Sequence, residues 1–459
     1  MMRQGLLSSM AAAILAAAPV LAQPVGLTNG AAGQFAPSTA TPGFTSDPGT
    51  IKAMWRGRLY FSADVMTDSY SRTGFGKQQP YGFAAFARIY PSFEGIAANG
   101  LKYGAYVEVR QNWGGAGPSG NTGGNTLIFR RESGWVGGGF GQLRFGQTDD
   151  ALALFTIGTF ENFGDNWNGD FAGALNSSQT TVIYPFLDGT SGTYGSVKLV
   201  YLTPQFAGFD AGISFAPSNA TSGYPASSAT ALGVGPSTVS LGALSGGFVG
   251  NQAALRRENN LVTAALRYRG NFGAVGVAAS AGFAIGEAMH NGGLTGLSAS
   301  GGPQFGYRDP MAFDGGLQVT YGGFAVGGHL LTGAINPNGS NNLMPVAKGH
   351  GGSTAFTVGA SYATGPYIVG ASYLAVVSPG AYGEDFAPVG GAVSPFGHRR
   401  EWGIAVGGTY GYATGAVLSL TYLYGQRHQA NYDFLANARG RTNNNTRVQE
   451  LILTNVFTW

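Results

Sequence analysis

Arginine residues recur at alternate positions of short segments in the first third of the chain, and their charge makes them the first candidates for a functional surface. The group comprises Arg56, Arg58, Arg88, Arg110 and Arg144. Each of them lies on the polar face of a segment in which apolar and polar residues alternate. A guanidinium remains protonated throughout the physiological pH range. The group therefore predicts a basic wall whose charge does not change with pH.

A long acidic segment without basic residues follows these arginines. No Lys or Arg occurs between Arg144 and Lys198, whereas Glu161, Asp165 and Asp170 lie in this interval. If the segment faced the basic wall across a narrow water-filled gap, the opposed charges would create a transverse field. Such a field passes small polar solutes better than apolar ones. We expect the three acidic residues to take this position.

Two other interpretations of the arginines stay open. Arg110 could pair locally with Glu108, and others could lie at a membrane interface. We favour a common lining role for the group as a whole. Arg130 and Arg131 are adjacent, so they cannot both point to one face of a regular strand. One of the two is expected near a rim or a bend.

Strict alternation predicts that β-strands position these side chains. In residues 55–66, Trp55, Leu59 and Phe61 share one face, and the arginines share the other. The same pattern predicts strands at residues 81–90, 102–113, 126–136, 141–148, 196–203, 209–215, 261–269, 274–285, 312–321, 324–331, 355–363, 367–376, 400–410, 416–424 and 448–459.

The connections between these strands alternate between short turns and long polar loops. This alternation is typical of a transmembrane antiparallel β-barrel, here of about sixteen strands, and a soluble sandwich does not require it. A closed barrel also satisfies every backbone polar group in lipid. If the first strand runs outward, all long loops lie outside and Trp459 ends on the periplasmic side.

Composition favours a membrane barrel over a soluble enzyme. The chain has 459 residues, of which 78 are Gly and 10% are charged, against typical values of about 7% Gly and about 25% charged. No apolar run of about 18 residues follows the N-terminal segment, so no helical span is predicted. Cys is absent, which excludes thiolate metal sites. The net charge of +3 argues against a nucleic-acid partner.

The N-terminal region divides into a targeting signal and an extension. Residues 1–22 combine Arg3, an apolar core and a small-residue ending at Ala22, which predicts a cleaved signal peptide and export. Residues 23–54 are rich in Pro, Ser, Thr and Gly without periodicity, which predicts a flexible extension. Residues 55–459 form the predicted barrel.

The beginning of the acidic segment predicts a short helix. Asp149 and Asp150 precede an apolar run, so we interpret them as an N-cap and prefer this to a lumen role for Asp149. Residues 165–170 are rich in Asp and Asn, as a Ca²⁺ loop is, but Trp167 stands where an oxygen ligand is required. Calcium is therefore the less favoured hypothesis, and no cofactor is expected.

Several segments resemble the Gram-negative general porins, especially their alpha-proteobacterial branch. They are residues 129–138 (FRRESGWVGG), 141–147 (GQLRFGQ), 159–165 (TFENFGD) and 198–209 (KLVYLTPQFAGF). The resemblance is clearest over residues 55–217. The terminal aromatic Trp459 also resembles the recognition signal of outer-membrane barrels.

The resemblance implies an outer-membrane homotrimer of sixteen-stranded barrels, each in contact with lipid. Every barrel would hold a water-filled channel for passive diffusion of small hydrophilic solutes and ions. The third outer loop of the family folds inward as the constriction, and it corresponds here to about residues 149–194. The N-terminal extension departs from family members that begin directly at the first strand.

Three other functions compete with this expectation. An outer-membrane enzyme lacks support, because neither a Gly-x-Ser-x-Gly elbow nor a His-Glu-x-x-His motif occurs. An adhesin built as a solenoid would require a fixed internal repeat, and none is found. A substrate-specific porin stays open, since its ligands would lie on loops and lumen faces that the sequence does not resolve.

Overall fold

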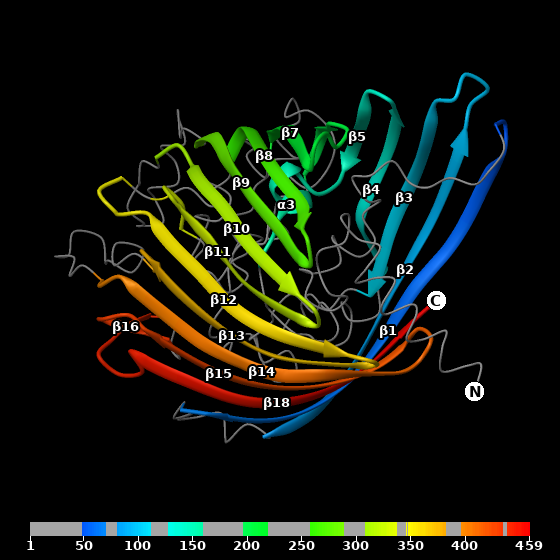
Figure 1. The fold of residues 1–459 in the computed structure, drawn as a ribbon. Helices are drawn as coiled ribbons and strands as arrows, with labels where there is room; N and C mark the ends of the chain where they lie inside the picture. Colours follow the sequence, from blue (N-terminus) through cyan, green and yellow to red (C-terminus); the bar gives the residue numbers. More distant parts are fainter. Residues whose placement is uncertain are drawn as a thin grey trace.

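Alternating residues produce long antiparallel strands along the chain, and these strands close on themselves as a barrel (Figure 1). In the computed structural model the described residues are 48–69, 80–111, 127–158, 196–218, 258–288, 308–336, 346, 348–381, 396–434 and 438–459. The expected signal peptide and most of the expected extension lie outside these residues.

Sixteen strands form the barrel, as expected from the alternation. They are β1 Ile51–Asp68, β2 Tyr81–Ile96, β3 Lys102–Gln111, β4 Leu127–Gly138, β5 Gly141–Gln147, β6 Val197–Leu202, β7 Phe209–Ser218, β8 Glu258–Phe272, β9 Val275–Ala288, β10 Met311–Tyr321, β11 Phe324–Gly333, β12 Ser353–Thr364, β13 Tyr367–Ser378, β14 Arg399–Ala413, β15 Ala416–His428 and β18 Asn445–Thr458. Each corresponds to an expected strand, although β1 begins earlier than Trp55.

Among the described residues, three further elements lie in the connections. The helix α3 Ala151–Phe155 follows β5. The strands β16 Tyr432–Asp433 and β17 Ala438–Arg439 pair with each other in the connection between β15 and β18. This small hairpin was not expected from the sequence. Among the described residues, no helix has the length and apolar character needed to cross a membrane.

The first and last barrel strands form the seam of the cylinder. β1 pairs with β2 on one side and with β18 on the other, so that Ala63 lies opposite Phe83 and Leu453. Gly57 and Trp459 exchange two backbone hydrogen bonds of 3.1 Å each. The chain therefore ends where the short turns lie, as the strand parity predicts. Closure gives every barrel strand two hydrogen-bonded neighbours, which lipid requires.

The two faces of the barrel wall differ in polarity. Trp55 and Phe83 on the outer face are 72% and 73% exposed, whereas Arg58 and Arg144 on the inner face are 1% exposed. Aromatic rings pair on the outer face near the short turns, for example Phe324 with Tyr362 at a centroid distance of 4.4 Å. Such rings are typical of the interface between hydrocarbon and water.

A β-bulge in β4 explains how Arg130 and Arg131 can be adjacent in one strand. Arg131 pairs with Glu108 across the sheet, but the next pair of the register joins Phe129 to Val109, so Arg130 is skipped. A bulge adds one residue to one strand and bends it locally. The expectation that one of the two arginines lies at a bend is confirmed.

Candidate pore constriction

After β5 the chain turns into the barrel instead of continuing outward. α3 lies on the inner side of the wall, next to β7 and β8 (Figure 1). The Asp150 side chain caps this helix by accepting a hydrogen bond from the Ala153 backbone N–H at 2.8 Å. The expected short helix is therefore present, with Asp150 as its cap.

The expected use of Asp149 as a cap is wrong. Its carboxylate lies 2.8 Å from the Arg131 guanidinium on the inner face of β4, and both side chains are buried. A buried guanidinium needs a charged partner, and Asp150 already caps the helix. Asp149 therefore ties the beginning of the inward segment to the barrel wall.

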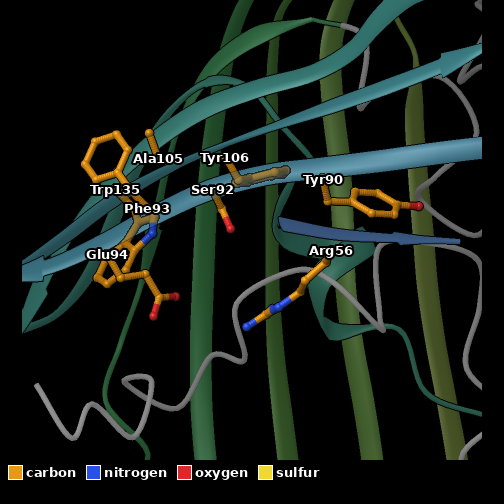
Figure 2. A pocket seen from close by; sticks show the side chains of 8 residues that line it. All are labelled: Arg56, Tyr90, Ser92, Phe93, Glu94, Ala105, Tyr106 and Trp135. Carbon is orange, nitrogen blue, oxygen red and sulfur yellow. The ribbon is translucent and has the colours of Figure 1, made fainter. Parts of the chain in front are cut away.

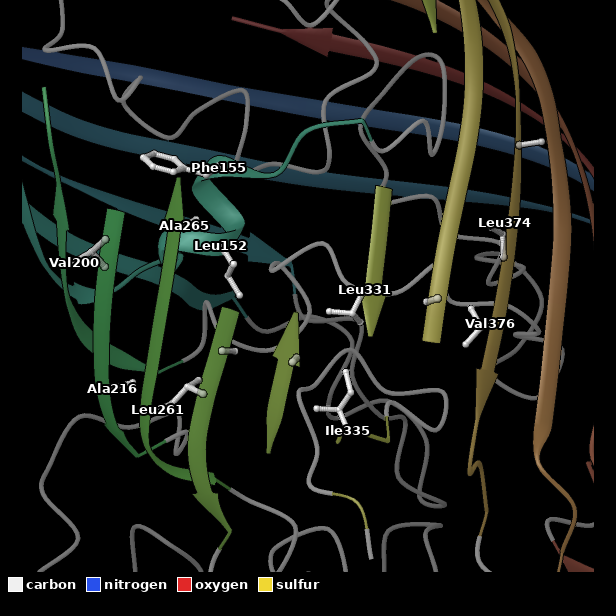
Figure 3. Close-up of a cluster of buried hydrophobic side chains, with 14 of the residues drawn as sticks. Leu152, Phe155, Val200, Ala216, Leu261, Ala265, Leu331, Ile335, Leu374 and Val376 are labelled. Atoms are coloured by element: carbon white, nitrogen blue, oxygen red, sulfur yellow. The ribbon is translucent and has the colours of Figure 1, made fainter. Parts of the chain in front are cut away.

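Apolar packing holds α3 against the wall. Leu152 and Phe155 of the helix belong to one buried cluster with Val200 of β6 and Ala265 of β8 (Figure 3). Opposite the helix stands Gly212, where a Cβ would lie 3.1 Å from Cβ of Ala151 and would crowd the site. The small residues of the wall thus leave a recess that the helix fills.

Beyond α3 the segment contacts the wall through its backbone. The Ile157 carbonyl lies 2.9 Å from Nδ1 of His329 on β11. A Cβ on Gly316 of β10 would collide with this same carbonyl, and Gly158 adopts a φ of +80° against the Gly328 backbone. The segment from Thr148 to Gly158 therefore crosses the inner wall from β5 to β11.

Arg267 on β8 anchors the middle of the segment. Its guanidinium lies 4.3 Å from the centre of the Phe155 ring and donates to the Leu154 carbonyl at 3.2 Å. Asp210 on β7 receives two hydrogen bonds from the same guanidinium, at 3.0 and 2.5 Å. A bidentate pair of this kind fixes the plane of the group.

Arginines from three neighbouring strands stand side by side on the inner wall. Arg88 pairs in register with Arg58 on one side and with Arg110 on the other. Glu108 forms an ion pair with Arg88 at 3.4 Å and a shorter ion pair with Arg131. Like charges in adjacent positions repel, so this row requires an acidic neighbour or water to be stable. The wall is consequently a strongly basic surface next to the inward segment.

Comparison with known proteins agrees with this architecture. The family model described as Gram-negative porin matches residues 9–429. This chain belongs to the Gram-negative porin family. The family and the closed barrel together make the protein an outer-membrane diffusion channel, as the sequence predicted. A search of curated proteins finds no match.

Solved structures share the fold at low sequence identity. The anion-selective porin from Comamonas acidovorans is 13% identical, with 89% of this chain and 100% of that chain covered and a TM-score of 0.50. A loop L8 deletion mutant of OmpT from Vibrio cholerae is 12% identical, with 89% and 99% covered and a TM-score of 0.49. In-vitro folded OmpT of Vibrio cholerae, described as a trimer form, is 11% identical, with 90% and 100% covered and a TM-score of 0.47.

The structure brings most of the predicted basic residues of this porin together. Arg58, Arg88 and Arg110 are neighbours, and Arg144 lies further along the inner face, where its Nε donates to Gln142 at 2.8 Å. Arg56 lies nearer the short turns. Glu161, Asp165 and Asp170 lie outside the described residues, as does the stretch considered for Ca²⁺. In the described part of the chain, no group of three or more His, Cys, Asp or Glu could hold a metal.

Arg56 borders a recess in the inner wall. Tyr90, Tyr106, Trp135 and Glu94 also line this recess, so aromatic rings and both signs of charge meet there (Figure 2). The strand register explains the arrangement. Arg56 on β1 pairs with Tyr90 on β2, and Glu94 lies four residues after Tyr90 on β2.

Sequence reasoning missed several residues that hold the inward segment. Lys198 on β6 donates to the Thr148 carbonyl and, at 2.7 Å, to the Ser196 carbonyl, so it joins the beginning of the inward segment to the beginning of β6. Arg267 and His329 lie far along the chain from their contacts. All three stand on inner-face positions of alternating strands, which is the one signal that marks them in the sequence.

A second basic cluster lies where β14 and β15 meet the long loops. Arg399 and Arg427 stand 5.1 and 4.1 Å from the centre of the Phe434 ring. The Gln429 amide donates to the carbonyls of Pro379, Ala381 and Gly397 at 2.9 to 3.0 Å. These contacts hold the β16–β17 connection against the neighbouring loop.

Proposed function

We propose that this porin is a trimeric general diffusion channel whose narrowest part lies between the inward segment and the arginines of β1–β5. The observation that carries the proposal is the docking of residues 148–158 on the inner wall, where Asp149 contacts Arg131. The rest of the expected constriction loop, to about residue 194, belongs to the proposal.

The proposed selectivity mechanism is a transverse field. Arg56, Arg58, Arg88, Arg110 and Arg144 supply its positive side, and Glu161, Asp165 and Asp170 are proposed for its negative side. Water ordered by opposed charges passes small polar solutes more easily than apolar ones. Since both signs are present, we expect weak ion selectivity.

A planar lipid bilayer tests this function directly. We expect open channels with conductance proportional to salt activity and a small reversal potential in a salt gradient. Shortening the segment within residues 149–178 should raise single-channel conductance, because it removes material from the bore. An unchanged conductance would refute the proposed constriction.

Specific transport is the second candidate, and the recess at Arg56 favours it. A solute with a carboxylate, an ammonium group and an apolar part would find Arg56, Glu94 and Trp135 in one place. A specific channel saturates, whereas a general one does not. Flux of such a solute that levels off with concentration, together with reduced ion current, would favour this candidate.

The absence of enzymatic activity and the trimeric assembly are also part of the proposal. Family membership supports a channel rather than an enzyme, and hydrolysis of lipid or peptide by the purified protein would contradict it. The exposed apolar outer face, including Phe61 and Leu453, suits contact with lipid and with further copies of the barrel. A mass measurement in detergent that gives a monomer alone would overturn the trimer.

A further inference from the structure

A buried histidine and aspartate hold the far end of the inward segment. His329 on β11 and Asp314 on β10 both lie on the inner wall and are buried. Nε2 of His329 lies 2.9 Å from Oδ2 of Asp314, and Nδ1 lies 2.9 Å from the Ile157 carbonyl oxygen. One imidazole therefore joins the barrel wall to the segment proposed to narrow the pore.

The two partners of this imidazole determine how many protons it must carry. A backbone carbonyl oxygen accepts hydrogen bonds and never donates them, and an ionised carboxylate does the same. Both ring nitrogens must then be N–H donors for both bonds to be made. A neutral imidazole has one donor and one acceptor, so it satisfies both partners only if Asp314 is protonated. The arrangement thus contains one proton more than a neutral imidazole beside a carboxylate.

An imidazolium beside a carboxylate supplies that proton and makes both bonds, and its bond to the carboxylate is charge-assisted. The surrounding inner-face residues are uncharged in the described part of the chain: Ser280 of β9, Gln318 of β10 and Thr357 of β12. Other buried charged residues of the described inner wall stand on strands that do not pair with β10 or β11, among them Asp210 on β7, Arg267 and Arg269 on β8, Arg399 and Glu401 on β14 and Arg427 on β15. Asp314 is therefore the described charge that faces the ring directly.

We propose that His329, protonated and paired with Asp314, is a positioning residue that sets the pore cross-section by holding the Ile157 carbonyl. When the extra proton leaves, the neutral ring retains a single N–H. That N–H goes to the carboxylate, because a bond to a charged acceptor is the stronger one. The Ile157 carbonyl then loses its donor, and the inward segment loosens at alkaline pH. This inference rests on the proposed constriction.

Two substitutions at the pair have opposite expected effects. Asp314→Asn offers an amide N–H to Nε2, so a neutral ring can keep its Nδ1 proton for Ile157. The Asp314→Asn channel should therefore show the acid-side conductance at every pH. His329→Ala removes the contact altogether, so its conductance should equal the alkaline value of the wild type at every pH. His398→Gln, at an exposed loop histidine, serves as the matched control and should keep the wild-type profile.

Single-channel conductance between pH 5 and pH 9 is the first measurement. As the pH rises, we expect the wild-type conductance, or its fluctuation, to increase measurably in a single titration step. Asp314→Asn and His329→Ala should both lack this step. A wild-type profile that matches the profile of Asp314→Asn, or a step that survives in His329→Ala, would overturn the proposal.

The wild-type protein supplies a second measurement that does not depend on a variant folding. Nitrogen chemical shifts of the His329 ring, recorded in detergent micelles, distinguish the imidazolium from either neutral tautomer. We expect an imidazolium at neutral pH that converts to the Nε2–H tautomer over the same interval as the conductance step. A neutral Nδ1–H ring at neutral pH would refute the proposed role of His329. This outcome is independent of the constriction, which loop shortening tests separately.

Discussion

At the scale of single residues, partners across strands decide what each charged group does. Arg88 lies between two other arginines and forms an ion pair with Glu108. Arg267 is held by Asp210 through Nε and Nη2 and donates through Nη1 to the Leu154 carbonyl of the inward segment. We therefore propose different roles for these two arginines, Arg88 as a source of the transverse field and Arg267 as an anchor.

Neutralising Arg88 should change ion selectivity without harming the fold. Arg88→Gln removes one positive charge from the proposed field and should shift the reversal potential toward cations. In a water-filled pore, where salt screens the interaction, one wall charge changes the energy of a permeating ion by about 0.5 kcal/mol. This energy corresponds to roughly a twofold change in the permeability ratio of cations to anions. Lys348→Gln, at an exposed loop position, is the control. Equal shifts in both variants would indicate general surface charge.

At the scale of elements, the inward segment depends on a wall that lacks side chains where it docks. The Ile157 carbonyl lies so close to Gly316 that a Cβ there has no room. The segment is held by backbone contact at this point and by apolar packing at α3. The barrel strands therefore shape the segment that is proposed to narrow the bore.

Gly316→Ala should displace the inward segment toward the lumen and lower the conductance. Overpacking of this kind also costs about 1–3 kcal/mol of folding stability. Gly411→Ala is the matched control, because a Cβ there meets only the Pro366 carbonyl at 3.8 Å. Conductance and urea unfolding of both variants check the expectation, and it fails if Gly316→Ala conducts like the wild type.

At the scale of the whole molecule, closure of the cylinder gives every strand its neighbours. The seam between β1 and β18 includes the two hydrogen bonds between Gly57 and Trp459. The last residue of the chain therefore contributes to closure as well as presenting an aromatic ring on the outer face.

Deletion of Trp459 should lower barrel stability by about 1–3 kcal/mol, since two backbone hydrogen bonds at about 1 kcal/mol each are lost. Unfolding in urea, followed by circular dichroism, measures this loss. Trp459→Phe keeps both backbone bonds and serves as the control. If the two variants unfold alike, the ring and not the hydrogen bonding stabilises the seam.

The amino-acid sequence by itself determined the barrel, its strand number and the identity of the two faces. Alternation is a local property with a period of two residues, so Trp55 and Arg58 reveal their faces without knowledge of any partner. The lengths of the connections likewise revealed which end holds the short turns. The same local signal placed the arginines on the inner face.

Only the tertiary structure decided which inner-face groups meet. Strand register and closure set Arg88 beside Arg58 and Arg110, and the path of the inward segment brings Asp149 to Arg131 and Ile157 to His329. These contacts join residues that are distant along the chain, and their geometry depends on turns, a bulge and a recess of small residues. A periodic pattern carries no information about such distances, because every register of two alternating strands with the same parity satisfies it equally well.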